Sequence, residues 1–180
     1  MTIPPGTYRL GPEQARLTVR TGRSGAAAKA GHDLLIEVTS WRAEIDAAED
    51  PAATTMQLSA DSTSLRVLEG TGGLQALGDD DKASIPKSID DDVLKRGAIE
   101  FQSSSVSADG DRLRVDGELE LRGARRPVSF ELHADADGRL TGSATLTQSD
   151  FGIKPYSTLF GALKVLDQVE VAIDGRLSAD

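Results

Sequence analysis

The stretch that decides the fold is a run of alternating apolar and polar residues, LRVDGELEL at 113–121 followed by VSFEL at 128–132. Apolar side chains at every second position place one face of an extended chain against an apolar interior and the other face in water. Both runs therefore predict strands that are buried on one face.

Turn sequences on either side of this stretch join it to further strands. They read ADGD at 108–111 and DADG at 135–138, and each contains the glycine that tight hairpin turns favour. Short turns force neighbouring strands to run antiparallel. Residues 98–147 therefore predict an antiparallel meander without helical crossovers.

Strand-like segments elsewhere bring the number of strands to about eight. They lie at residues 7–10, 16–21, 34–46, 54–68 and 169–173. Closing into a barrel removes unpaired strand edges, and a barrel of about eight strands can be filled by side chains or can hold one small ligand. The expected fold is all-β: an eight-stranded antiparallel barrel that forms a single domain over residues 1–180.

One segment departs from the period of two. Apolar residues recur at intervals of four between Ile85 and Leu94, which predicts one short amphipathic helix at about 80–96. We expect Pro86 early in this helix and Gly97 as its C-terminal stop.

Composition excludes several classes of function. Hydrophobic residues make up 38% of the chain and aromatic residues only 4%, so the interior must be aliphatic, which disfavours sugar and nucleobase sites. A net charge of −9 repels phosphates, so we expect no nucleic-acid partner and no stable membrane insertion. With no cysteine and two histidines, no metal or other cofactor is expected. The start lacks a signal-like apolar run, which predicts a cytoplasmic protein.

Three passages occur in a specific order along the chain: GTYRL at 6–10, RGARRPVSF at 122–130 and SDFGI at 149–153. Together they resemble the YceI-like family, a group of lipocalin-like barrels that bind polyisoprenoid-type lipids. The resemblance spans nearly the whole chain. It implies an eight-stranded lipocalin-like barrel with a helix near one end, an elongated apolar tunnel, and a binding role without catalysis. The alanine-rich residues 26–30 depart from the aromatic segment that the family often has here.

The candidate site combines inward-facing apolar residues with polar residues at the barrel mouth. The predicted ligand-binding residues are His32, Leu34, Ile36, Phe101, Leu119, Phe130, Phe151, Ile153, Tyr156, Leu159 and Phe160. His32, Lys29, Lys154 and Lys164 are candidates for contacting a polar headgroup, although His32 could instead satisfy backbone groups in a turn. The large side chains of residues 151–160 are expected to be buried, either as a cap over the barrel end or around a ligand.

We therefore expect a transport or carrier protein, not an enzyme, that holds a long-chain isoprenoid or other lipid inside the barrel. A strand of about seven residues spans roughly 23 Å, which suits an extended chain. The alternative is a ligand-free barrel that acts as a stress-related or protein-interaction module. An enzyme that uses His32 with Asp33 would lack supporting catalytic motifs. The resemblance also leaves a homodimer open.

Overall fold

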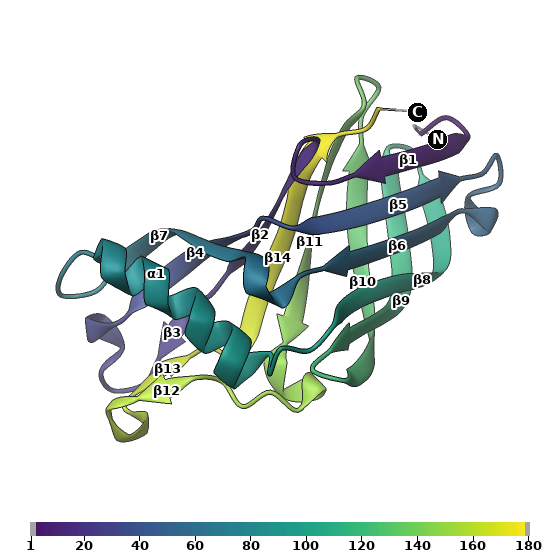
Figure 1. Cartoon of the computed structure of the whole chain (residues 1–180). Helices are drawn as coiled ribbons and strands as arrows, with labels where there is room; N and C mark the ends of the chain where they lie inside the picture. Colours follow the sequence, from purple (N-terminus) through teal and green to yellow (C-terminus); the bar gives the residue numbers. More distant parts are fainter. Residues whose placement is uncertain (1–2, 179–180) are drawn as a thin grey trace.

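The computed structural model describes residues 3–178, which form antiparallel strands and one α-helix (Figure 1). The strands are β1 (Gly6–Leu10), β2 (Ala15–Arg20), β3 (Arg23–Ser24), β4 (His32–Val38), β5 (Trp41–Ala47), β6 (Thr55–Ala60), β7 (Leu65–Gly72), β8 (Ile99–Asp109), β9 (Arg112–Leu121), β10 (Ala124–Ala134), β11 (Arg139–Thr147), β12 (Ser157–Thr158), β13 (Leu163–Val165) and β14 (Gln168–Arg176). The helical segments are α1 (Asp79–Ser88), the π-helical turn η4 (Ile89–Val93) and the 3₁₀ turns η1 (Ala28–Ala30), η2 (Pro51–Ala53), η3 (Ser62–Ser64), η5 (Gln148–Phe151) and η6 (Leu159–Gly161).

Eleven strands within residues 3–178 form one antiparallel sheet in the order β1-β5-β6-β8-β9-β10-β11-β14-β2-β4-β7. On one side, β1 pairs with β5 and β2 pairs with β4; on the other side, β6 pairs with β5 and β7 pairs with β4. Because β4 and β5 follow each other in the chain, this pairing brings the two ends of the sheet together, and the sheet curls strongly. The three short strands β12, β13 and β3 form a second small sheet at one end of the curled sheet (Figure 1). The large sheet therefore forms a barrel-like wall around an interior.

The all-β class and the antiparallel meander are confirmed, whereas the number of eight strands is not. The structure divides the N-terminal half into shorter strands, because the chain bends between β4 and β5 and again at η3, between β6 and β7. These two bends meet: the Asp61 N–H donates to the Ser40 carbonyl (3.0 Å), and the Thr39 N–H donates to the Ser64 carbonyl (2.9 Å). The alternation of apolar and polar residues in the sequence does not reveal such bends. The reason is that the backbone N–H and carbonyl groups stay hydrogen-bonded through the bends, so no residue type marks them.

A packed apolar core fills one end of the barrel. Its side chains are no more than 6% exposed and come from Ile3, Tyr8, Trp41, Val106, Leu113, Val115 and Ala134. The Tyr8 hydroxyl donates to the Pro4 carbonyl (2.8 Å), which satisfies the polar end of this buried ring. This solid end is the one near which both termini lie (Figure 1).

The helix predicted at about 80–96 is confirmed as α1 followed by η4, with two differences. Pro86 lies in the last turn of α1 rather than near its start. Lys95 and Arg96, not Gly97, have the left-handed φ values (54° and 55°) that end the helical segment. Gly97 is needed for close packing instead, because a Cβ atom there would lie 3.0 Å from a backbone carbon of the β9–β10 turn.

Candidate functional site

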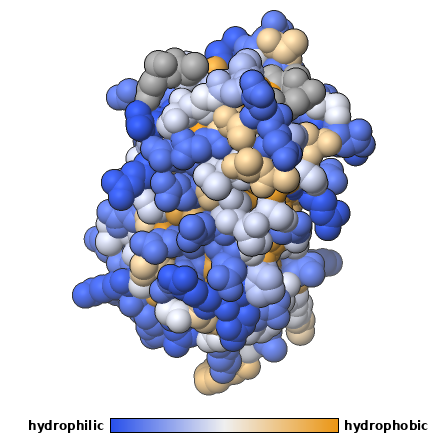
Figure 2. Space-filling model, turned by 90° about the vertical axis from the view of Figure 1, so that its right-hand side faces the viewer, coloured by the Kyte–Doolittle hydropathy of each residue, from blue (hydrophilic) through white to orange (hydrophobic). Residues whose placement is uncertain are grey.

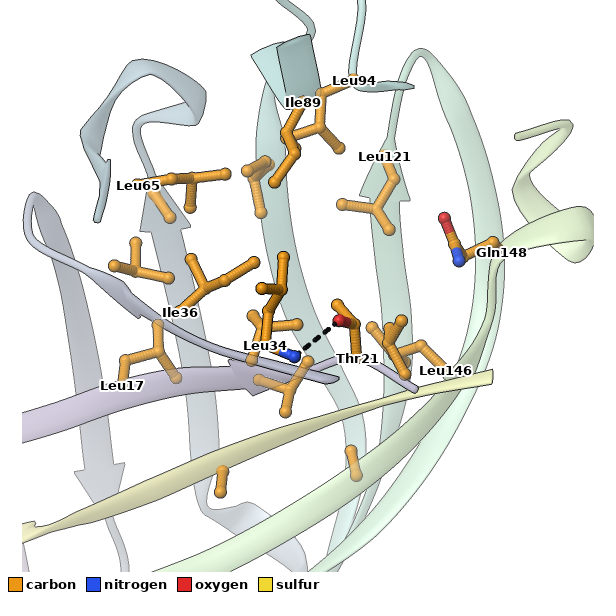
Figure 3. Close-up of a pocket in the computed structure, with 18 of the residues that line it drawn as sticks. Leu17, Thr21, Leu34, Ile36, Leu65, Ile89, Leu94, Leu121, Leu146 and Gln148 are labelled. Carbon is orange, nitrogen blue, oxygen red and sulfur yellow. Dashed lines mark hydrogen bonds between the residues drawn. The ribbon is translucent and has the colours of Figure 1, made fainter. Parts of the chain in front are cut away.

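The interior beyond the packed core contains a cavity of about 660 Å³. Inward-facing side chains of the curled sheet form most of its wall. In Figure 3, Leu17, Ile36 and Leu65 from three different strands point into the same space. The volume lies in the range of pockets that hold a small ligand.

Among residues 3–178, no Asp, Glu, Lys or Arg lines the cavity. The polar residues of the lining are Thr21, His32, Gln57, Ser84, Ser88, Ser143, Gln148 and Tyr156. Five of these residues, Thr21, His32, Gln57, Ser84 and Gln148, already have hydrogen-bond partners. For example, the Thr21 hydroxyl accepts from the Leu34 N–H (3.2 Å; Figure 3), and the Gln148 amide donates to the Leu166 carbonyl (2.9 Å). An unpaired charge in such a wall would be costly, so the interior suits an uncharged, largely apolar molecule.

The helical segment completes one side of the cavity. Ile85 on α1 and Ile89 on η4 line it, and Figure 3 shows Ile89 and Leu94 reaching toward Leu121. Asp90, on the same turn as Ile89, is buried and accepts a hydrogen bond from the Ser62 hydroxyl (2.6 Å). This buried bond ties the helical segment to the bend between β6 and β7, so the helix is a fixed part of the wall.

The structure places eight of the predicted ligand-binding residues in the lining of the cavity. They are His32, Leu34, Ile36, Phe101, Leu119, Phe130, Ile153 and Tyr156. The rings of Phe101 and Phe130 form a tilted pair, with centroids 5.3 Å apart and planes at 58°. Their assignment as ligand contacts stays a prediction.

Three other predicted residues lie outside the lining. Phe151 is buried behind the wall, in a cluster with Leu119, Leu146 and Ile153. Leu159 and Phe160 project into solvent. The expectation that the large side chains of residues 151–160 are buried is therefore wrong for Tyr156, Leu159 and Phe160. The reason is that the turn between β12 and β13 is held by strand pairing rather than by burial.

Of the residues predicted to contact a polar headgroup, only His32 lines the cavity. Lys29, Lys154 and Lys164 are exposed and do not line the cavity. His32 does line it, and its Nε2 atom lies 2.8 Å from the Gln75 carbonyl oxygen. Because a carbonyl can only accept, Nε2 must carry a proton, so Nδ1 is the ring atom that could accept a hydrogen bond from a ligand. Asp33 does not orient this imidazole but lies 3.9 Å from the Arg23 guanidinium.

Several residues of the wall were not among the sequence candidates. They include Thr21, Leu65, Ile89, Leu94, Leu121, Leu146, Gln148, Leu163 and Val165. The alternating pattern already places Leu121 and Leu146 on inward faces, and helical spacing places Ile89 and Leu94 on one side of the helix. Val165 lies in a strand of three residues, which is too short to show a period.

Ionised groups of the described chain lie mainly on the outer face of the sheet. Arg139 donates to Asp174 (2.9 Å), and this hydrogen bond lowers the pKa of Asp174 from its ordinary value. The Ser129 hydroxyl likewise lowers the pKa of Asp116. Within residues 3–178, no group of three or more His, Asp or Glu side chains could hold a metal ion. Over the same range, no helix has the length and apolar character needed to cross a membrane.

Comparisons with known proteins match this architecture. The model of the YceI-like domain family matches residues 8–177. A UPF0312 protein of Pseudomonas aeruginosa is 35% identical over 71 residues, so the match spans 34% of this chain and only 37% of that relative's length. Among solved structures, BcnA of Burkholderia cenocepacia has a TM-score of 0.62 at 16% identity, covering 89% of this chain and 94% of its own. A Campylobacter jejuni YCEI protein has a TM-score of 0.57 at 14% identity, covering 81% and 85%. At these identities the two structures show a shared fold alone.

Proposed function

Because the chain belongs to the YceI-like domain family, and its barrel surrounds a largely aliphatic cavity, we propose that it is a carrier for a long-chain hydrophobic molecule of the isoprenoid or fatty-chain type. The observation that carries this proposal is the cavity of about 660 Å³, lined almost throughout by aliphatic side chains. A barrel filled by its own side chains would leave no such space.

The size of the cavity favours a chain over a compact metabolite. At about 30 Å³ for each water-sized group, it has room for roughly 20 methylene-sized groups. Each buried methylene contributes about 0.8 kcal/mol, so an extended chain gains enough to offset the cost of being ordered. The apolar residues of successive strands would contact the chain along its length.

The lack of charge in the wall favours a neutral ligand body. A carboxylate inside would be desolvated without a cation to pair with it, because the predicted lysines lie outside the lining. A hydroxyl could instead donate to Nδ1 of His32 at the edge of the cavity. We therefore favour a neutral isoprenoid-type alcohol over a fatty acid held by its carboxylate.

Extraction of the purified protein with organic solvent, followed by mass spectrometry, tests the proposal directly. We expect a neutral long-chain lipid, and we expect delipidated protein to take up geranylgeraniol in native mass spectrometry more tightly than a fatty acid of equal length at pH 7. Protein that binds neither probe would overturn the carrier proposal. That result would support the ligand-free interaction module instead.

A binding role rather than catalysis is supported by the partner of His32, which is a backbone carbonyl and not a carboxylate or nucleophile. A cytoplasmic location, a single domain and a homodimer remain predictions. Sedimentation of the purified chain would test the last of these.

A further inference from the structure

The large hydrophobic side chains that are exposed in the described chain gather at the open end of the barrel, opposite the packed core. These five residues, called here the apolar rim, are Leu74, Tyr156, Leu159, Phe160 and Leu166. Phe160 is fully exposed, and Leu74 is 80% exposed. Scattered exposed apolar residues need no explanation, but a group at the entrance of a cavity marks an interaction site.

Backbone pairing places the segments that carry the rim side by side. The β12–β13 hairpin pairs with β3, and the Leu166 N–H donates to the Gly22 carbonyl (2.9 Å). The loop that carries Leu74 is joined to β4 through the Gln75–His32 hydrogen bond. Figure 2 shows hydrophobic surface at the lower tip of the molecule, at the height of the β12–β13 turn in Figure 1.

The backbone at the tip is held in an uncommon conformation. Leu159 and Phe160 have left-handed φ values of 52° and 55°. This conformation is sterically unfavourable for a residue with a side chain. Neither residue is buried within the chain, and backbone strain of this kind is found mainly at functional segments.

Basic residues lie in the two segments that surround most of the rim. Residues 21–32 and 151–166 contain four basic and no acidic residues, whereas Asp33, Asp150 and Asp167 border these segments and Asp79–Asp81 follow the loop that carries Leu74. Of the four, Arg23 is bound to the carbonyls of Gly31 and Thr71 (2.8 Å each). Lys29, Lys154 and Lys164, called here the basic fringe, are exposed and form no ion pair within residues 3–178.

We propose that the apolar rim and the basic fringe dock the open end of the barrel onto the surface of a lipid bilayer that contains anionic lipids. Apolar side chains flanked by lysines match the acyl and phosphate layers of such a surface. A second copy fits less well, because a twofold contact would set the fringe against the same lysines of its partner. Acidic residues that lie more than about 8 Å from the membrane surface are screened by salt, which weakens their repulsion.

The proposed docking rests on the carrier function, and it gives the ligand a path from the bilayer into the cavity. Tyr156 belongs to both the rim and the cavity lining, and Leu163 and Val165 of the same hairpin also line the cavity. A chain that leaves a bilayer beneath the rim would enter the cavity without crossing water. The large cost of exposing a long alkyl chain to water would thereby be avoided.

Flotation of the full chain with vesicles tests the docking. We expect binding to phosphatidylcholine vesicles that contain phosphatidylglycerol and little binding to phosphatidylcholine alone. Replacing Lys154→Gln and Lys164→Gln should weaken binding about fivefold for each lysine. Phe160→Asn, which tolerates the left-handed backbone, should weaken binding at least tenfold. Phe160→Trp should keep binding and shift its emission to the blue when vesicles are added.

Lys87→Gln, on α1, is a matched control that should bind vesicles like the unaltered chain. Uptake of geranylgeraniol in vesicle-free buffer should be unchanged in the Phe160→Asn variant, because Phe160 does not line the cavity. If vesicles bind while the probe does not, the carrier function fails and the docking stands. Equal binding of Phe160→Asn and the unaltered chain to vesicles would overturn the docking. So would a dimer that forms through the rim in sedimentation experiments without any vesicle binding.

Discussion

A large side chain introduced into the wall of the cavity should strongly weaken ligand binding while leaving the barrel intact. Ala144 lies on β11, where it is paired with Val171 of β14, and it lines the cavity. The change Ala144→Phe adds a ring of six carbons to this position. An aromatic residue is favoured in a strand, and the space it enters is apolar and empty. The perturbation therefore acts on the cavity rather than on the sheet.

The magnitude follows from the volume that the ring takes. Six ring carbons displace about six methylene-sized groups of a bound chain, each worth about 0.8 kcal/mol. The chain can recover part of this loss, up to about 5 kcal/mol, by sliding toward the open end. We expect a net loss of about 2–4 kcal/mol, which is 30- to 1,000-fold in Kd.

Isothermal titration calorimetry of delipidated protein with geranylgeraniol measures this change. The matched control is Thr145→Phe, because Thr145 is the next residue on the same strand and is exposed on the outer face. The control should bind like the unaltered chain, and the unliganded Ala144→Phe protein should keep or raise its Tm. Unchanged affinity in a folded Ala144→Phe protein would show that the ligand does not occupy the cavity, and the reasoning would be refuted.

Three further predictions concern stability. Asp90→Ala removes the partner of the buried Ser62 hydroxyl, so urea unfolding followed by tryptophan fluorescence should show a loss of about 1–3 kcal/mol; a loss near zero would contradict this. Because Arg139 lowers the pKa of Asp174 below 3.8, the stabilisation by this carboxylate is complete above that pH and disappears as the pH falls through the lowered value. Asp174→Asn should therefore lower the urea midpoint at pH 6, and should lower it by less as the pH falls below 3.8. Gly117→Ala places a Cβ atom 2.4 Å from a carbonyl oxygen of the neighbouring strand, and calorimetry should show a lower Tm from a cost of about 1–3 kcal/mol.

The wall of the cavity could largely be predicted from the sequence, because a period of two assigns each residue of a long strand to one face. Leu119 and Phe130 illustrate this: both alternate with charged or polar neighbours, and both line the cavity. The apolar side of the helix was visible for the same kind of reason. A period of about four between Ile85 and Ile89 places both on the side that faces the interior.

The end of the barrel could not be predicted in this way, because long-range pairing decides it. Residues 157–165 include four large apolar residues, yet their position depends on β13 pairing with β3, where Lys164 lies opposite Ser24. Nothing local in the sequence specifies that contact. Composition therefore placed Phe160 in a buried cap, whereas the fold leaves it in solvent. The bends of the N-terminal strands escaped prediction for the same reason.

The packed core that contains Tyr8 and Trp41 closes one end of the cavity, so a ligand can enter and leave only at the other end. If the chain carries a lipid as proposed, that lipid would enter tail first and leave head first, because the cavity is closed at the other end. A lipid longer than the cavity would leave its polar head outside. The depth of the cavity would thus determine how much of the lipid is buried. An enzyme could act on the exposed polar head while the apolar tail stays inside the barrel.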